Sequence, residues 1–190
     1  MKNELRTKYR IPEAKVLPDL LAEKDPEWED LLKAEKWWQK DNLRKVDVTG
    51  LNEKSAGKIS TYKKLNEIML EIGGSETCFI GWDEDYIKLL ERGYYREGKS
   101  KMEKGQPRQC HYNAARIYDE RVEEDDVIIC TGFALSEDGM WRAHSWLLQK
   151  YITGRGKVRT RILETTTKRI AYFGFELTSE EANEFAELNH

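Results

Sequence analysis

The chain has 190 residues, of which 39% are hydrophobic and 35% charged, and its formal net charge is -3. This length and composition predict a folded protein with a sizeable core, and the interleaved charges, with no basic stripe, predict no nucleic-acid partner. No stretch reaches the roughly 18 apolar residues of a membrane span, and the first residues lack the apolar core of a secretory signal, so neither membrane association nor secretion is expected.

The cysteine pattern favours a reducing compartment. The sequence has 3 cysteines and no CxxC spacing. An odd number at such spacing predicts neither a disulfide framework nor a zinc site, and a cytoplasmic location fits it best. Cys78 and Cys130 are expected to be small buried hydrophobes. We expect no metal and no cofactor.

Residues 1–104 are expected to be mostly helical and to pack on the rest of the chain or cover it as a lid. Asp25-Pro26 signals a helix start. The helix that follows carries a tryptophan cluster, expected to be core or a surface for a protein partner, made of Trp28, Trp37 and Trp38.

Two more helices are expected before residue 96. The first, capped by Ser55 or Ser60, is expected to end at Gly73-Gly74. Its apolar face comprises Tyr62, Leu65, Ile68, Met69 and Ile72. Asp83 is expected to cap the other helix, and the polar, glycine-rich stretch 96–109 is typical of an exposed connection.

Residues 105–190 are expected to form the α+β core of the protein. A helical pattern begins at Cys110. Runs rich in β-branched and aromatic residues then predict strands, separated by the turns SEDG and TGRG, over 127–135, 140–152, 157–167 and 168–177. A short acidic helix from 179 ends the chain. The expected fold is therefore α+β, with a helical first half and then a cysteine-bearing helix packed on an antiparallel β-meander.

Three residues of this core have the types and settings of a thiol catalytic set. Cys110 lies where a proline-containing loop enters a helix, a position that lowers a thiol pKa. His144 and Glu164 lie on strand-like runs and fit a general base and the carboxylate that orients it. The alternatives are a buried Cys110, a core His144, and a Glu164 paired with Arg142 or Arg161.

Hairpin arithmetic brings two of these residues together. Strands joined by TGRG should pair residues whose numbers sum to about 308 to 310. His144 and Glu164 sum to 308, so they are expected opposite or nearly opposite each other on one face, within hydrogen-bonding reach. A register slip of one residue would bring Thr165 opposite His144 instead.

Further residues are candidates for the same site. The Cys110 N–H, with Gln106 or Gln109, is expected to stabilise an oxyanion, and Trp141 and Trp146 are candidates for substrate contact. His111 is expected to point away from the chemistry. Asn113 is expected to make a local hydrogen bond, and the cations after residue 156 to form a solvated strand face.

The order of several short motifs over about 105–177 resembles the papain-like/transglutaminase-like cysteine enzymes, in particular their small bacterial and phage members. These motifs are Cys110-His111-Tyr112-Asn113-Ala114, Gly132-Phe133-Ala134, His144-Ser145-Trp146, Glu164-Thr165-Thr166 and Tyr172-Phe173-Gly174. The resemblance implies Cys110 as nucleophile, His144 as base and Glu164 as third member. The chain departs from the family in having Glu where Asp or Asn is usual, and Gln four rather than six residues before the cysteine.

The function expected from this reading is a cysteine-dependent hydrolase or acyl transferase. It would act on an amide or peptide-type bond through a thioester, as a peptidase, an amidase, a deamidase or a transferase. The alternative is a non-catalytic protein-binding module on the same fold, such as a host-interaction factor that uses the Trp-rich segment, since fold does not imply function.

Overall fold

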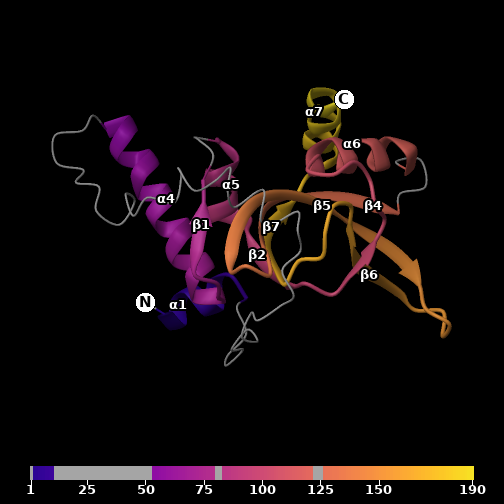
Figure 1. The fold of residues 1–190 in the computed structure, drawn as a ribbon, viewed down its shortest axis with the longest axis horizontal. Coiled ribbons are helices and arrows are strands. Elements are labelled where there is room, and N and C mark those ends of the chain that lie inside the picture. Colours follow the sequence, from indigo (N-terminus) through magenta and orange to yellow (C-terminus); the bar gives the residue numbers. More distant parts are fainter. Residues whose placement is uncertain (1, 11–52, 80–82, 122–125) are drawn as a thin grey trace. The chain divides into compact units, whose positions relative to one another are not determined.

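The computed structural model describes residues 2–10, 53–79, 83–121 and 126–190 (Figure 1). These residues form two compact units. The first comprises Met1–Tyr95 with Leu135–Arg142, and the second comprises Arg96–Ala134 with Ala143–His190. The fold class is α+β, as the sequence predicts. Helices and a mixed sheet both occur in the described part.

The first unit is built around one long helix. Its helices and its first strand are α1 (Lys2–Lys8), α4 (Glu53–Ile72), β1 (Glu76–Cys78) and α5 (Asp85–Arg92). Four of the five predicted apolar positions of α4 are buried, and the helix ends before Gly73-Gly74 as predicted. The predicted caps are wrong, because α4 begins at Glu53 and both Ser55 and Ser60 lie inside it.

The N-cap of α5 is Glu84 and not the predicted Asp83, which lies one residue earlier and accepts the Asp85 N–H on its Oδ1 at 2.9 Å. This satisfies one of the donors that a helix start leaves without a partner. Strand β1 pairs in parallel with the beginning of β5 (Met140–Ile152), with Glu76 beside Met140. The first half therefore contains a short strand as well as helices. The predicted Trp-rich helix and residues 80–82 lie outside the described residues.

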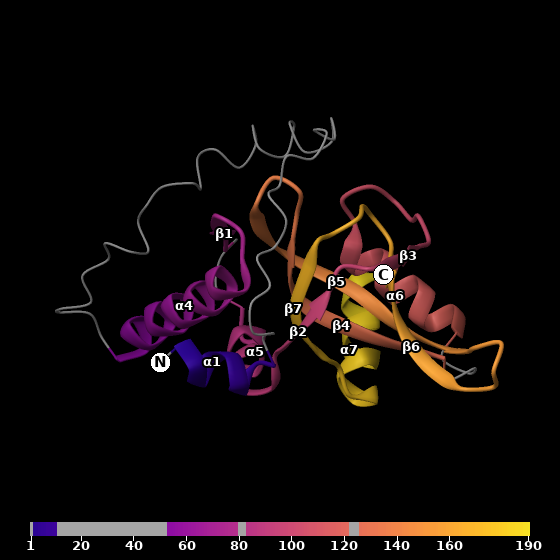
Figure 2. The same cartoon turned by 90° about the horizontal axis from the view of Figure 1, so that it is seen from below.

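The second unit is a curled sheet with two helices on its outer face (Figures 1 and 2). The remaining strands are β2 (Tyr94–Glu97), β3 (Ser100–Met102), β4 (Val127–Leu135), β6 (Val158–Glu164) and β7 (Ala171–Glu176). The strand order is β2-β7-β4-β5-β6-β3. A simple meander would put β7 beside β6. The predicted meander is therefore wrong at its last strand, since β7 lies beside β4.

The sequence predicts that the stretch 96–109 is an exposed connection, but part of this stretch forms a strand. Strand β3 pairs in parallel with β6, so that Ser100 lies beside Ile162 and Met102 beside Glu164. A three-residue strand of Ser, Lys and Met carries too little apolar pattern to be recognised from sequence. Its pairing makes the sheet mixed and fixes the segment that leads to Cys110.

Strands β5 and β6 form the predicted antiparallel hairpin. Leu147 pairs with Leu163 and Ile152 with Val158, which gives a constant sum of 310. Continued toward the sheet interior, this register sets Glu164 opposite Trp146. His144 is thus diagonal to Glu164, two residues along the same face, and not directly opposite it.

The curled sheet closes around a cluster of buried side chains that all come from strands. These are Cys130, Ala134, Trp146, Leu148, Ile162 and Tyr172. Gly174 makes room for it, because an added Cβ there would lie 2.3 Å from Trp146 Cη2. Cys78 and Cys130 are both buried, as predicted.

Helices α6 (Cys110–Arg121) and α7 (Ser179–Asn189) lie side by side on the outer face (Figures 1 and 2). Tyr118 on α6 donates its hydroxyl to Asn183 Oδ1 on α7 at 3.2 Å. Thr178 and Glu181 form a capping box at the start of α7. Within the described ranges, no helix combines the length and apolar character needed to cross a membrane.

Candidate functional site

The position of Cys110 is set by the loop in front of it. After β3, the Glu103 N–H donates to the Glu164 carbonyl at 2.9 Å, and the Gly105 N–H donates to the Thr165 carbonyl at 2.8 Å. These two bonds continue the β3–β6 pairing past the end of the strands. They hold the start of α6 close to the residue that follows β6.

Asn113 then closes the loop onto the helix. Its Oδ1 accepts the Gln106 N–H and its Nδ2 donates to the Gln106 carbonyl, both at 2.8 Å. Asn113 is fully buried. This confirms the predicted local role of Asn113 and leaves the Gln106 backbone fixed.

A tight turn leads from Gln106 to Cys110. The Gln109 N–H donates to the Gln106 carbonyl across Pro107 and Arg108. Arg108 has a φ of 62°, the left-handed conformation that the third residue of a type II turn requires. A residue other than glycine is strained in that conformation, so the surrounding hydrogen bonds must stabilise the turn. Cys110 therefore enters the first turn of α6, where its N–H has no intrahelical acceptor.

His144 and Glu164 meet inside the curled sheet. His144 Nε2 donates to Glu164 Oε2 at 2.9 Å, and the two residues are 1% and 0% exposed. Burial alone would raise the pKa of Glu164, but the charge of His144 and its hydrogen bond lower that pKa to about 2. The predicted meeting of these two residues is confirmed, and Arg142 binds Asp138 instead of Glu164.

Both oxygens of Glu164 are saturated by donors. Oε1 accepts the Thr165 N–H, the Thr166 N–H and the Thr166 hydroxyl, at 2.8, 3.0 and 3.1 Å. Oε2 accepts the Tyr172 hydroxyl at 2.8 Å in addition to His144. A buried carboxylate with this many donors stays ionised and fixed in orientation.

The thiol of Cys110 lies within reach of His144. Burial raises the pKa of the thiol, yet the charge of His144 and a hydrogen bond from His111 bring it well below its ordinary value. Burial would likewise lower the pKa of His144, but the charges of Glu164 and Cys110 raise it to about 9. His144 Nδ1 makes no hydrogen bond with any described residue, and the charge of Cys110 acts on the ring that carries it. The arrangement favours a thiolate beside an imidazolium.

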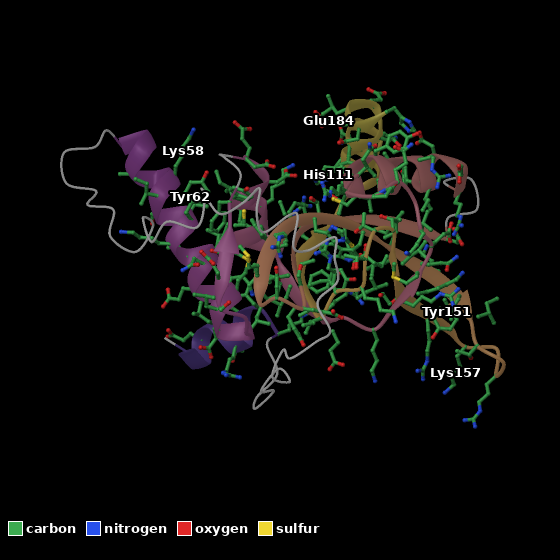
Figure 3. The ribbon with its side chains drawn as sticks, in the orientation of Figure 1. Lys58, Tyr62, His111, Tyr151, Lys157 and Glu184 are labelled. Carbon is green, nitrogen blue, oxygen red and sulfur yellow. The ribbon has the colours of Figure 1, made fainter. Side chains whose placement is uncertain are left out.

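His111 does not point away from Cys110 as predicted, since it forms a hydrogen bond with the thiol. Its Nδ1 lies 2.7 Å from Ser145 Oγ, and the Ser145 hydroxyl donates to Thr131 Oγ1 at 3.3 Å. The hydrogen bond with Ser145 fixes the orientation of the His111 ring against β5. The ring of His111 also packs against Phe185 of α7, with centroids 5.8 Å apart. Figure 3 labels His111 at the start of α6.

The two tryptophans proposed for substrate contact are structural. Trp141 is fully buried in the first unit and donates its Nε1 to the Gly73 carbonyl at 2.8 Å. Trp146 is 2% exposed and packs in the strand cluster, 4.8 Å from the Tyr172 ring and nearly parallel to the His144 ring. Neither ring presents surface to a ligand in this structure, so the structure adds no support to the predicted substrate contacts. Trp146 instead supports His144.

The glutamines remain predictions. The side chains of Gln106 and Gln109 are both exposed. Among Cys110, His144 and Glu164, only Cys110 is partly exposed, so the sulfur is more accessible than the imidazole. The described residues contain no cluster of three or more His, Cys, Asp or Glu side chains placed to hold a metal ion.

Comparison with known proteins adds no relative. No family model matches the chain, and searches of the curated proteins and of the solved structures give no significant match.

Proposed function

We propose that this protein is a cysteine-dependent hydrolase or acyl transferase that acts on an amide or peptide-type bond, on a papain-like/transglutaminase-like core. The observation that carries the proposal is the line of three groups from Glu164 through His144 to Cys110. The carboxylate holds Nε2 of the ring, Nδ1 makes no hydrogen bond with any described residue, and the charge of His144 lowers the pKa of the Cys110 thiol. Such a line is the arrangement that activates a thiol nucleophile.

The proposed reaction follows from the charges of the pair. The Cys110 thiolate attacks the carbonyl carbon, and the developing oxyanion is stabilised by the Cys110 N–H in the first helical turn. The carbon–nitrogen bond breaks, and His144 Nδ1 gives its proton to the leaving amine. Water or a second amine then attacks the thioester, His144 takes the proton, and the thiolate is released.

His144 remains oriented throughout this cycle. Its Nε2–H stays on Glu164, and its ring lies against Trp146. His111 supplies a further hydrogen bond to the sulfur and is itself held by Ser145. We assign His111 as a positioning residue, since it acts through the thiolate.

Selective alkylation of the native protein tests the proposal. Iodoacetamide is expected to label Cys110 at neutral pH and to spare the buried Cys78 and Cys130, as located by mass spectrometry of the peptides. An activated acyl ester is expected to leave an acyl group on Cys110 that disappears with time. The Cys110→Ala variant is the control.

Two outcomes would count against the proposal. Labelling of Cys78 or Cys130 with Cys110 spared would show that the thiol is not activated. A biological function retained by Cys110→Ala would favour the non-catalytic binding module.

A further inference from the structure

The hairpin of β5 and β6 concentrates positive charge in a chain that is acidic overall. Residues 149–163 contain five cations and no acidic residue, against a net charge of -3 for the chain. The cations are Lys150, Arg155, Lys157, Arg159 and Arg161. Three of them, Arg155, Lys157 and Arg159, make no ion pair with any described residue.

The two faces of this hairpin differ in chemistry. Arg159 pairs with Tyr151 across the strands, and the Arg161 guanidinium lies 4.8 Å from the centre of the Tyr151 ring. Because successive side chains of a strand alternate between faces, Val158 and Ile152 pair on the opposite face. One face thus carries Arg159, Arg161 and Tyr151, and the other carries the apolar pair Val158 and Ile152 at the tip, followed by Thr160 and Lys150.

The apolar pair is open to solvent. Ile152 is 73% and Val158 68% exposed. A hollow of about 380 Å³ adjoins the tip of the hairpin, lined by Thr153, Gly154, Arg155, Lys157 and Arg159. The two exposed side chains are cross-strand partners, so they form one contiguous apolar spot beside the cations.

The backbone of β6 also has a free edge here. Strand β3 pairs with β6 only from Ile162 to Glu164, so over 158–161 the outer edge faces no other strand of the described chain. Figures 1 and 2 show the hairpin extending away from α6 and α7, and Figure 3 labels Tyr151 and Lys157 on it. An unpaired edge offers N–H and C=O groups to an added strand.

We propose that the outer edge of β6 at residues 158–161 binds an extended acidic polypeptide segment in which acidic and apolar residues alternate. Such a segment adds as a strand beside Val158–Arg161. Its acidic side chains lie on the face of Arg159 and Arg161, and its apolar side chains lie on the face of Val158 and Ile152. The alternation matches that of β6 itself, since the side chains of both strands repeat every two residues.

The features of the edge select this occupant over others. A second copy of the hairpin would bring like charges together, which opposes pairing. A nucleic acid would engage the cations but would leave both the apolar pair and the backbone edge without partners. An acidic, alternating strand satisfies all three features at once. The inference goes beyond the proposed function and does not depend on thiol chemistry.

Fluorescence anisotropy with labelled peptides tests the inference on the full chain, in wild-type protein and in Cys110→Ala. A peptide alternating Glu and Val is expected to bind both proteins, at least about tenfold more tightly than a peptide of the same composition arranged in blocks. Binding is expected to weaken with added salt. Amide hydrogen exchange is expected to slow within 158–161 when the peptide is bound.

Matched variants locate the surface. Arg159→Glu and Val158→Ser are each expected to weaken binding, with Lys64→Glu on α4 as the charge-matched control that leaves it unchanged. Equal binding of the alternating and block peptides would overturn the inference, because the surface would then recognise the charge of a peptide and not the order of its residues. Tighter binding of single-stranded DNA or of phosphatidylserine vesicles than of the peptide would overturn it as well. Arg159→Glu and Val158→Ser are expected to lose peptide binding and to retain acylation at Cys110. This result would show that the peptide site and the proposed chemistry are independent.

Discussion

At the scale of single residues, the length of the Glu164 side chain matches its diagonal position. Glu164 and His144 are offset by two residues on neighbouring strands, and diagonal neighbours have backbones about 7–8 Å apart. A direct pair would be closer and would suit a shorter acid. The extra methylene of Glu spans the diagonal and still leaves Oε1 for the turn formed by Thr165 and Thr166. The length of the Glu side chain thus suits this register.

Shortening that side chain is expected to impair the thiol. In Glu164→Asp the carboxylate no longer reaches both His144 and its own turn, so the pKa of His144 falls from about 9 and the pKa of Cys110 rises. The rate of iodoacetamide alkylation as a function of pH is expected to shift toward alkaline pH. His111→Asn, which leaves the His144–Glu164 pair intact, is expected to shift it less. An unshifted profile in Glu164→Asp would show that the carboxylate does not act on the thiol.

At the scale of elements, the decisive piece is the loop between β3 and α6. Its backbone is bonded to Glu164 and Thr165 at one end and to Asn113 at the other. The helix start and the end of β6 are therefore joined by backbone bonds as well as by packing. Gly105 lies at the closest point, since an added Cβ would be 2.3 Å from Asn113 Oδ1.

A methyl group at Gly105 is expected to open this loop. Gly105→Ala forces Asn113 away from Gln106, and overpacking of this kind costs about 1–3 kcal/mol of unfolding free energy. Alkylation of Cys110 is expected to slow in parallel. Gly154→Ala, where no atom lies within 4 Å, is the matched control, and by restricting the unfolded chain it is expected to add about 0.4–1 kcal/mol of stability. Thermal melts and alkylation rates measure both effects.

At the scale of the whole molecule, the thiolate–imidazolium pair determines how stability depends on pH. The pKa of His144 is raised from 6.5 to about 9, and the pKa of Cys110 is lowered well below 9.0. Between pH 6.5 and about 9, the folded pair holds its one proton on His144 and the unfolded pair holds one proton on the thiol. Folding then neither takes up nor releases a proton at this pair.

Removing the thiol is expected to make the free energy of unfolding depend on pH in a range where the wild-type pair leaves it constant. In Cys110→Ala, Glu164 still raises the pKa of His144, so folding takes up a proton and stability falls as pH rises above 6.5. In both proteins the Glu164 contribution is lost as pH falls from 4.5 through about 2. Urea unfolding midpoints across pH measure the difference between the two proteins. A constant difference from pH 6.5 to 9 would mean that Cys110 is a neutral thiol.

Local signals accounted for the elements that have a strong pattern or a short turn. The apolar face of α4, the stop at Gly73-Gly74 and the pairing of β5 with β6 could be predicted because each depends on neighbours in sequence. The hairpin sum fixed the face of His144 and Glu164. It gave the sum of paired residue numbers only as 308 to 310, since the turn type decides whether the two residues form a direct or a diagonal pair.

Long-range pairings gave no such signal. β3 is a short polar strand, and its partner β6 lies about sixty residues further along the chain. The position of β7 beside β4 and the burial of Trp141 against Gly73 likewise depend on how the sheet curls. His111 was missed because helical spacing alone does not show that the sheet offers Ser145 beneath it.

The sequence by itself determined which residue types stand at a helix start and on two paired strands, because periodicity and turn chemistry are local. Only the tertiary structure decided that Cys110 joins His144 and Glu164, since that meeting rests on backbone bonds from residues 103–105 to Glu164 and Thr165. It also decided that the tryptophans support the site from the core. Those contacts depend on the packing of segments far apart in the chain, which local patterns do not encode.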